Sequence, residues 1–435
     1  MSALLSKSNG YKGALAILIL LAITLAFPIA LQCSDKKKKA EAAPPPEPPK
    51  LNIDTSKLVW PNPPNIARVK WLNYYTGMKI DRAPASATKK KQSWMDRVAG
   101  TKQQDNTDRL KTFPWQMIGP YGVAIDSKGL VYVADQKVGA IFIVNTETHD
   151  ATLIKNGVDA HFQWINGVAL DDSDRLFVSD GQLHHVLVFN SKHQVENQIA
   201  EGLIDPVGLA IDNENRFLYV VDEQQDQVIV YDSDSLRELR RIGTAPGPGK
   251  KHQLTAPGDF AAPTNVALDA EGNVYVTDTL NSRVEIFDAD GQFISTFGTP
   301  GDSPGYLFRP KGIAIDSDGH IWVADQSQDR VQVFNREGQL LTYIGDTHAN
   351  SPGQFKALVG IAIDKQNRVF TTEQYPGRMQ EFRYVTDAEA AAEKTKREND
   401  LKAAAEARRA AAAPAAEQKP TAAPDAKTPA ATPPN

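Results

Sequence analysis

The chain has a single cysteine, Cys33, among its 435 residues. One cysteine cannot form an intrachain disulfide, and it cannot build a cysteine-based metal cluster. The sequence also lacks a surplus of positive charge, because its formal net charge is −5 with both signs interspersed. No overall field draws such a chain to nucleic acid, so we expect no nucleic-acid partner.

Recognisable catalytic and cofactor motifs are absent too. There is no G-x-S-x-G elbow, and "GTAPGPGKK" from Gly243 has Lys251 where a phosphate loop has Ser or Thr. The stretches "DADG" at 288–291 and "DSDG" at 316–319 resemble parts of a calcium loop but lack its closing Glu. We therefore expect no cofactor and no bound metal.

Long hydrophobic runs are missing except near the N-terminus. Residues 13–32, "GALAILILLAITLAFPIALQ", carry no charge, and Lys7 and Lys12 precede them. Twenty residues at helical rise span about 30 Å, which is one bilayer core. Residues 1–35 are therefore predicted to be an export signal or membrane anchor, with the rest of the chain outside the cytoplasm, in the periplasm or on the cell surface.

Two forms of this anchor stay open. Cys33 follows the apolar run as the lipidated cysteine of a bacterial lipoprotein would, but Gln32 stands where a small residue is expected. An uncleaved transmembrane anchor is therefore favoured over lipidation of Cys33. The run Lys36–Lys39 opposes export, since positive charge next to a span prefers the cytoplasm.

Both ends of the chain read as spacers around a central domain. Residues 36–63 form a Lys- and Pro-rich linker, which is stiff and extended by composition. Residues 385–413 are rich in Ala, Glu, Lys and Arg and predict a solvent-exposed helix. Residues 414–435 are rich in Pro and Ala and predict disorder.

The middle of the chain repeats one phrase six times, at intervals of 41 to 57 residues. The six copies are "GVAIDSKGLVYVAD" from Gly122, "GVALDDSDRLFVSD" from Gly167, "GLAIDNENRFLYVVD" from Gly208, "NVALDAEGNVYVTD" from Asn265, "GIAIDSDGHIWVAD" from Gly312 and "GIAIDKQNRVFTTE" from Gly360. A repeat of this period indicates the blades of a propeller.

Each copy predicts a four-stranded antiparallel blade. "GVAID" is a nearly continuous apolar run, suited to a strand covered on both faces. Turn formers, a second strand and two further short strands follow it, such as "RVEIFD" and "FISTFG" in the fourth copy. One blade cannot bury its two faces alone, whereas six blades in a ring bury them against one another.

The phrases resemble the NHL repeat over roughly residues 118–384. The fourth and fifth copies carry the pattern nearly in full, in "VYVTDTLNSRVEIFDADGQFISTFGTPGDSPGYLFRPKGIAID". This resemblance implies an all-β fold, a six-bladed β-propeller of NHL type, over residues 64–384.

The sixth copy has no fourth strand before the Ala-rich helix. The stretch "VWPNPPNIARVKWLNYYTG", residues 59–77, alternates like a strand but has no neighbour in the chain to pair with. We expect Ile66–Leu72, within 64–77, to close the ring as the outermost strand of blade six. Residues 78–117 are then an insertion, with "SWMDRVAG" as a short helix.

Among propellers of this kind, the chain also resembles the peptidyl-hydroxyglycine amidating lyases in its blade pattern. Those enzymes place zinc-binding histidines just before the first strand of a blade. The corresponding residues here are Tyr121, Asn166, Val207, Thr264, Lys311 and Val359, none of which is histidine. The pattern therefore does not support lyase activity.

Two other sets of polar residues are interpreted as structural. One acid ends each second strand: Asp135, Asp180, Asp222, Asp278, Asp325 and Glu373. Because it recurs in every blade, we expect it to cap a turn. The pair His184–His185 is not expected to bind a metal, since adjacent strand residues point to opposite faces; His185 stands where other blades have a basic residue.

One mouth of the ring remains as the candidate binding surface. It is formed by polar residues before the first strands and after the second strands: Tyr121, Asn166, Thr264, Lys311, Gln136, Gln182, Glu223, Gln326 and Gln374. Such a surface suits a protein or peptide, with carbohydrate as a further option. The predicted function is a membrane-tethered, non-enzymatic binding scaffold of the bacterial envelope. The alternative is a propeller enzyme, similar to the lyases or to metal-dependent lactonases.

Overall fold

The computed structural model describes residues 54–77, 115–244, 256–345 and 349–412. The predicted anchor, Cys33, most of the linker, the short helix at 93–100 and the C-terminal tail lie outside these residues. Within them, no helix is both long enough and apolar enough to cross a membrane.

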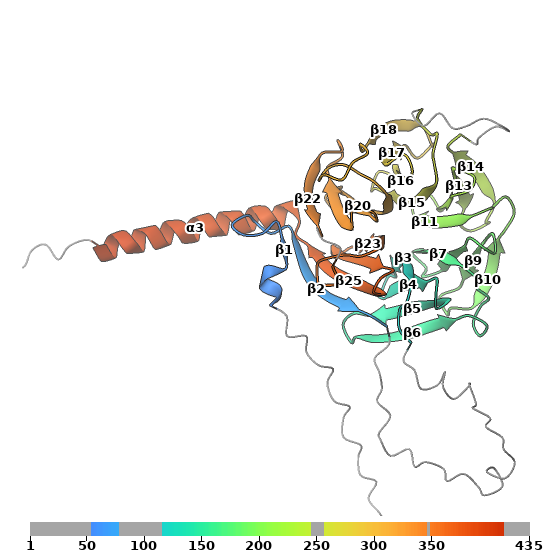
Figure 1. Cartoon of the computed structure of the whole chain (residues 1–435), viewed down its shortest axis with the longest axis horizontal. Coiled ribbons are helices and arrows are strands. Elements are labelled where there is room, and N and C mark those ends of the chain that lie inside the picture. Colours follow the sequence, from blue (N-terminus) through green and yellow to red (C-terminus); the bar gives the residue numbers. More distant parts are fainter. Residues whose placement is uncertain (1–53, 78–114, 245–255, 346–348, 413–435) are drawn as a thin grey trace, which may run out of the picture. The chain divides into compact units, whose positions relative to one another are not determined.

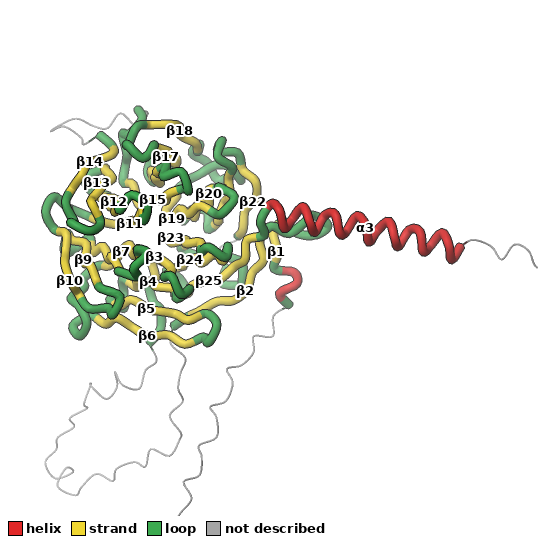
Figure 2. The backbone as a smooth tube through the Cα atoms, turned by 180° about the vertical axis from the view of Figure 1, so that it is seen from behind, coloured by secondary structure: helices red, strands yellow, loops and turns green. Residues whose placement is uncertain are grey.

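The described chain forms six antiparallel sheets arranged in a ring (Figure 1), and Figure 2 shows the same ring from behind. Blades one and two comprise β3 (Pro120–Ile125), β4 (Val131–Asp135), β5 (Ala140–Asn145) and β6 (Asp150–Lys155), then β7 (Ile165–Leu170), β8 (Leu176–Asp180), β9 (His185–Phe189) and β10 (Val195–Ile199). Blades three and four comprise β11 (Pro206–Asp212), β12 (Phe217–Asp222), β13 (Gln227–Asp232) and β14 (Glu238–Ile242), then β15 (Pro263–Leu268), β16 (Val274–Asp278), β17 (Arg283–Phe287) and β18 (Phe293–Phe297).

Blades five and six complete the ring. They comprise β19 (Pro310–Ile315), β20 (Ile321–Asp325), β21 (Arg330–Phe334) and β22 (Leu340–Ile344), then β23 (Leu358–Ile363), β24 (Arg368–Glu373) and β25 (Arg378–Tyr384) with β1 (Val59–Trp60) and β2 (Val69–Tyr75). The first strands contact one another in order around the centre, and β23 contacts β3. The predicted six-bladed propeller is confirmed.

The hydrophobic core lies between blades and not within them. Six clusters of buried side chains are present in the described chain, and each draws on two neighbouring blades. The second strands are buried along their whole length in four blades, as in β4 and β20, and at all but the first residue in β12 and β24. Each blade is therefore stabilised by its two neighbours, as expected for a ring of repeats.

Blade six has five strands because the N-terminal segment joins it. Strand β2 pairs antiparallel with β25, with Trp71 opposite Phe382, and β1 pairs with the start of β2. The strand covers Val69–Tyr75, three residues later than the stretch Ile66–Leu72 expected from the sequence. Trp60 pairs with Val69, so residues 61–68, with their three prolines, form the connection between β1 and β2 and are not part of the strand.

A glycine in five of the first strands lets neighbouring blades approach closely. A Cβ atom at Gly122, Gly167, Gly208, Gly312 or Gly360 would lie less than 3.0 Å from backbone of the next blade. Gly360 meets the carbonyl oxygen of Tyr121, so this contact also closes the ring between blades six and one. The conspicuous glycine of the repeat is therefore a packing residue.

Helix α3 (Asp387–Ala412) follows β25, where the sequence predicts a solvent-exposed helix. Thr386 and Glu389 cap its first turn: Glu389 N–H donates to Thr386 Oγ1 at 3.2 Å, and Thr386 N–H donates to Glu389 Oε2 at 2.9 Å. This reciprocal pair is a capping box. The exposed side chains along the helix agree with a sequence that has no apolar stripe.

Candidate functional site

The central channel has two distinct ends. At the amino end the first strands begin and the second strands finish, as the pairing of Pro120 with Asp135 shows. At the carboxyl end the first strands turn into the second strands. Both ends carry polar residues, so either end could hold a binding site.

The six acids that end the second strands hold loops together at the amino end. All six side chains are fully buried. The Asp135 carboxylate accepts hydrogen bonds from the N–H groups of Ile118 and Gly119, which precede its blade, and of Lys137 and Val138 in its own turn. Asp180 and Asp325 do the same in blades two and five. The predicted capping role is confirmed.

Three of the predicted mouth residues form a chain of amide hydrogen bonds. Gln374 Nε2 donates to Gln136 Oε1 at 3.0 Å, and Gln136 Nε2 donates to Asn166 Oδ1 at 2.5 Å. Asn166 Nδ2 then donates to the carbonyl oxygen of Pro206 at 3.3 Å. The chain crosses blades six, one, two and three, and its amides are largely used within the protein.

Thr264 belongs to a hydroxyl pair that links blades four and five. Its Oγ1 lies 2.7 Å from Thr279 Oγ1, and it donates to the carbonyl oxygen of Lys311 at 3.1 Å. Thr279 donates to the carbonyl oxygen of Pro310 at 2.7 Å. Thr279 was not among the predicted residues, although it occupies the same repeat position as Gln136.

Gln182 lies one residue beyond this repeat position and is exposed. The residue equivalent to Gln136 in blade two is Gly181, and a Cβ there would meet the Asp205 carboxylate of blade three. Asp205 is a further residue of the amino end that the sequence did not single out. Gln326 occupies the equivalent position in blade five and is half-buried.

Tyr121, Glu223 and Lys311 come from blades one, three and five and are half-buried. Burial raises the pKa of Glu223, an effect that Lys311 opposes, and burial lowers the pKa of Lys311, an effect that Glu223 opposes. Burial also raises the pKa of Tyr121, and the charges of Glu223 and Asp205 add to it. These groups therefore share one electrostatic environment.

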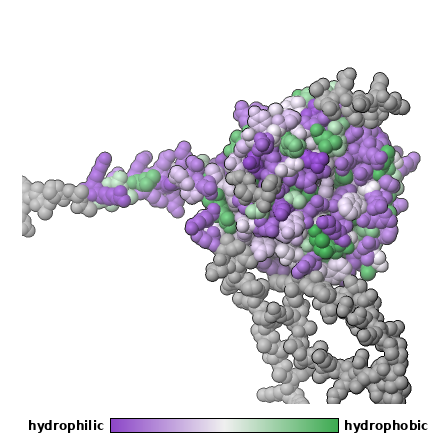
Figure 3. Space-filling view, in the orientation of Figure 1, coloured by the Kyte–Doolittle hydropathy of each residue, from purple (hydrophilic) through white to green (hydrophobic). Residues whose placement is uncertain are grey.

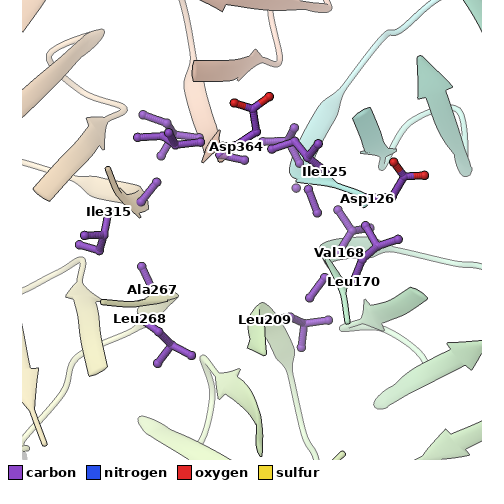
Figure 4. Close-up of a pocket in the computed structure, with 18 of the residues that line it drawn as sticks. Ile125, Asp126, Val168, Leu170, Leu209, Ala267, Leu268, Ile315 and Asp364 are labelled. Carbon is purple, nitrogen blue, oxygen red and sulfur yellow. The ribbon is translucent and has the colours of Figure 1, made fainter. Parts of the chain in front are cut away.

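The carboxyl end of the channel holds a cavity of about 440 Å³. Figure 4 shows aliphatic side chains such as Ile125, Leu170 and Ile315 around it. The acids at its rim serve turns: Asp126 Oδ1 accepts from the N–H groups of Lys128 and Leu130, and Asp364 accepts from Gln366 and Arg368 in the same way. Among the described residues, these acids at the carboxyl end are therefore occupied by hydrogen bonds within their own turns.

Comparison with known proteins identifies the family. The family model of the SMP-30/gluconolactonase/LRE-like region matches residues 84–308, just over half of the chain. The chain belongs to this family. The NHL-repeat model matches residues 309–334. No curated protein sequence matches the chain.

Solved structures share the fold of this SMP-30/gluconolactonase-like chain. A Bacteroides thetaiotaomicron protein of unknown function has 16% identity and a TM-score of 0.50, covering 62% of this chain and 71% of that one. A Xanthomonas campestris gluconolactonase has 16% identity and a TM-score of 0.47, with 65% and 93% covered. Virginiamycin B lyase from Staphylococcus aureus has 13% identity and a TM-score of 0.46, with 62% and 96% covered. At these identities the Bacteroides protein supports the fold alone.

The residues of this SMP-30/gluconolactonase-like propeller do not fit a metal centre. No group of three or more His, Cys, Asp or Glu side chains in the described ranges is placed to hold an ion. The two stretches that resemble calcium loops are capped turns: Asp288 accepts from the N–H groups of Asp290 and Gln292, and Asp316 from those of Asp318 and His320. The described residues therefore offer no site for a metal-dependent step.

The amino end of this SMP-30/gluconolactonase-like ring presents one large exposed apolar side chain per blade. These residues, 42% to 58% exposed, are Ile118, Trp164, Ile204, Leu280, Phe308 and Tyr375. We call them the apolar ring. The capping acids hold four of them in place through their N–H groups, those of Ile118, Trp164, Ile204 and Phe308. The apolar ring is not evident from the sequence because its members occupy two different repeat positions, before the first strand in four blades and after the second strand in two.

Charge is unevenly distributed around the apolar ring. Acids predominate on the side of blades two to four, where Arg241 is a base among them: Asp159, Glu201, Asp205, Glu223, Asp226 and Asp259. Bases lie on the side of blades five, six and one: Arg309, Lys311, Lys356, Lys137 and Lys155, with Asp302 as an acid among them. On the face drawn in Figure 3, hydrophobic residues form separate patches in a mainly hydrophilic surface.

A second polar cluster lies where the N-terminal segment meets blade five. Tyr384 Oη donates to Asp318 at 2.7 Å, accepts from Arg68 at 3.0 Å, and lies 3.0 Å from His320 Nδ1. His320 also bonds to Asp316 at 3.2 Å, and Arg68 pairs with Asp387 of α3. A cavity of about 360 Å³ is bordered by Arg68, His320, Tyr384 and Asp387 together with apolar residues.

This cluster predicts a pH dependence of stability. The hydrogen bond to Asp316 is the main cause that raises the pKa of His320 above its ordinary value of 6.5, and the charges of Asp387 and Asp318 add to it. A raised pKa means that the folded state binds the proton more tightly. The stabilisation is therefore complete below pH 6.5 and is lost as the pH rises through the folded-state pKa.

As the pH rises above 6.5, we expect the melting temperature of the His320→Asn variant to fall less than the melting temperature of the unchanged protein. His193→Asn is the matched control, because burial lowers the pKa of His193 and its contribution has the opposite sign. Thermal unfolding between pH 6 and 9 measures both. Parallel pH profiles for the unchanged protein and His320→Asn would contradict the prediction.

Proposed function

We propose that this chain is a membrane-tethered, extracytoplasmic propeller that binds a protein partner through the amino end of the ring and catalyses no reaction. The apolar ring is the observation that carries the proposal, because six blades place exposed apolar side chains around one end. Interfaces are built around such anchors, with aromatic residues enriched among them. Trp164, Phe308 and Tyr375 supply aromatic anchors here.

The uneven charge around the apolar ring defines the chemistry of the partner. A complementary surface has apolar side chains at its centre, basic groups toward blades two to four, and acidic groups toward blades five, six and one. Charge complementarity of this kind fixes orientation and speeds encounter. A carbohydrate ligand would gain nothing from this separation of charge, so a protein is the occupant we propose.

Crosslinking at the apolar ring tests the docking surface. A photoreactive residue at position 164 or 308 should give one discrete protein adduct in envelope membranes. The matched positions 195 and 341, which are exposed apolar residues of the outer strands β10 and β22, should not. The identified partner should bind Trp164→Ala or Phe308→Ala about 30-fold more weakly, as for interface hot spots. Equal adducts at all four positions would contradict the proposal.

A fusion reporter tests the location. A reporter placed after Lys50 should indicate an extracytoplasmic position, because Lys7, Lys12 and residues 13–32 have the layout of an export signal or anchor. A reporter placed before Lys7 is the matched control and should indicate the cytoplasm. A cytoplasmic signal from the fusion after Lys50 would mean that the run Lys36–Lys39 decides topology.

A lactone hydrolase is the second candidate, because the chain belongs to a family described by gluconolactonase. We propose that the chain does not hydrolyse lactones, because the described residues form no group that could hold a metal ion. Purified chain incubated with gluconolactone and either Ca²⁺ or Zn²⁺ should hydrolyse it no faster than buffer. Hydrolysis that saturates with substrate would favour the enzyme.

A further inference from the structure

Three blades leave polar side chains without partners at the centre of the amino end. Glu223 occupies the repeat position of Gln136, and Tyr121 and Lys311 occupy that of Asn166. In blades one and two these positions meet, since Gln136 donates to Asn166 at 2.5 Å. Tyr121, Glu223 and Lys311 therefore lie at the same end of the channel, on blades one, three and five, where the charges of Glu223 and Lys311 act on each other.

The side chains of these three residues have no hydrogen bond or ion pair within the part of the chain that the structure describes. Glu223 is offered no amide partner, because its neighbours at the same repeat position are the short residues Gly181 and Thr279. Half-burying a charged group without a partner is unfavourable. Lys311 and Glu223 affect each other electrostatically but do not form an ion pair, an arrangement that folding alone does not explain.

A second acid lies on the side of Glu223. Asp205 also belongs to blade three and is half-buried beside Gly181. Its charge adds to the effects that raise the pKa of Glu223, as burial raises the pKa of Asp205 itself. Across the axis, Arg309 lies two residues before Lys311 and is exposed. Blade three therefore presents negative charge, and blade five positive charge.

We infer that the centre of the amino end binds a small zwitterion, with its ammonium group at Glu223 and Asp205 and its carboxylate at Lys311. The Tyr121 hydroxyl can donate a hydrogen bond to the carboxylate. An amino acid and a short peptide with free ends share this chemistry. The inference rests on the proposed binding function and deepens it, because the zwitterion would occupy the centre of the apolar ring.

Titration calorimetry of the purified full-length chain tests the ligand class. The probes are glycyl-leucine, its N-acetyl derivative, its C-terminal amide, and leucine. Glycyl-leucine or leucine should bind, and the better of the two identifies a peptide or an amino acid. Blocking either end of glycyl-leucine should weaken binding on the order of 10- to 100-fold, the value of one charged hydrogen bond. Equal binding of the blocked probes, or no binding of any probe at millimolar concentration, would overturn the inference.

Two substitutions separate binding from folding. Lys311→Met and Glu223→Gln should each remove probe binding and raise the melting temperature, because each removes a half-buried charge without a partner. Lys192→Met and Glu147→Gln, exposed residues at the carboxyl end, should change neither. A fall in melting temperature for both site variants would assign these residues a structural role and overturn the inference.

The apolar ring distinguishes this inference from the proposed function. Trp164→Ala with Phe308→Ala should weaken binding of the protein partner strongly, and should weaken glycyl-leucine binding far less than Lys311→Met does. If the chain binds its partner through the apolar ring but none of the probes, only the zwitterion inference fails. If the probes bind and no partner is found, only the proposed docking function fails.

Discussion

A soluble version of the chain that begins at residue 78 is expected to unfold at a far lower temperature than one that begins at residue 51, or to aggregate. The shorter version loses β1 and β2, and with them the buried side chains of Val69, Trp71 and Tyr75. Burial of three such side chains contributes on the order of 5 kcal/mol. That amount is comparable with the whole stability of a typical domain, about 5 to 15 kcal/mol.

The loss also exposes polar groups and an edge. Trp71 Nε1 donates to Gln380 at 2.9 Å within blade six, and β25 would be left with an unpaired edge. Open edges of this kind promote association between molecules. Thermal unfolding of the two versions measures the effect, and a version that lacks residues 414–435 should melt with the complete one. Equal melting temperatures for the starts at 51 and 78 would show that β2 contributes nothing to the ring.

The substitution Gly360→Val is expected to destabilise the ring by about 3 kcal/mol, the upper range for overpacking a core. A Cβ atom at Gly360 would lie less than 3.0 Å from the carbonyl oxygen of Tyr121 and from Thr372 Oγ1. The carbonyl belongs to the first strand of blade one, so the clash is relieved only if blades six and one move apart. Thr372 would then also lose its hydrogen bond to that carbonyl.

A matched substitution tests whether the effect belongs to this contact. Gly157→Asn places a side chain where no atom lies within 4 Å, and asparagine tolerates the positive φ of 72° found there. We expect that variant to melt within a few degrees of the unchanged protein. Chemical or thermal unfolding measures both variants, and similar losses for Gly157→Asn and Gly360→Val would contradict the packing role.

The repeated part of the structure was predictable because its determinants are local. The phrase "G-x-A-x-D" and the acid that ends each second strand recur at nearly constant spacing, and both describe contacts that repeat in every blade. The pairing of β2 with β25 was expected from a strand without a neighbour. Its bounds were three residues too early because the alternation of side chains does not reveal that β1 pairs with the start of β2, which leaves residues 61–68 as the connection.

The candidate site was predictable only in part because its contacts join different repeats. The amide chain from Gln374 to Asn166 depends on how far one blade lies from the next, which no single repeat encodes. Gln182 was predicted to line the mouth because of its residue type. The residue that directly follows the capping acid in blade two, as Gln136 does in blade one, is Gly181. The apolar ring was missed because its members occupy two different repeat positions, and because single exposed apolar residues are common on protein surfaces.

The two ends of the described chain meet in blade six, and this sets the order of events in synthesis. Trp71 pairs with Phe382, and more than 300 residues separate them. A ribosome that adds about 5 to 20 residues per second needs roughly 15 to 60 s to make that interval. During this time β2 has left the ribosome but its partner strand does not exist, and five blades can form only an open arc. A chain that crosses a membrane unfolded, after β25 has been made, would not expose such an arc. A chain that folds before β25 has been made would form an arc without its sixth blade.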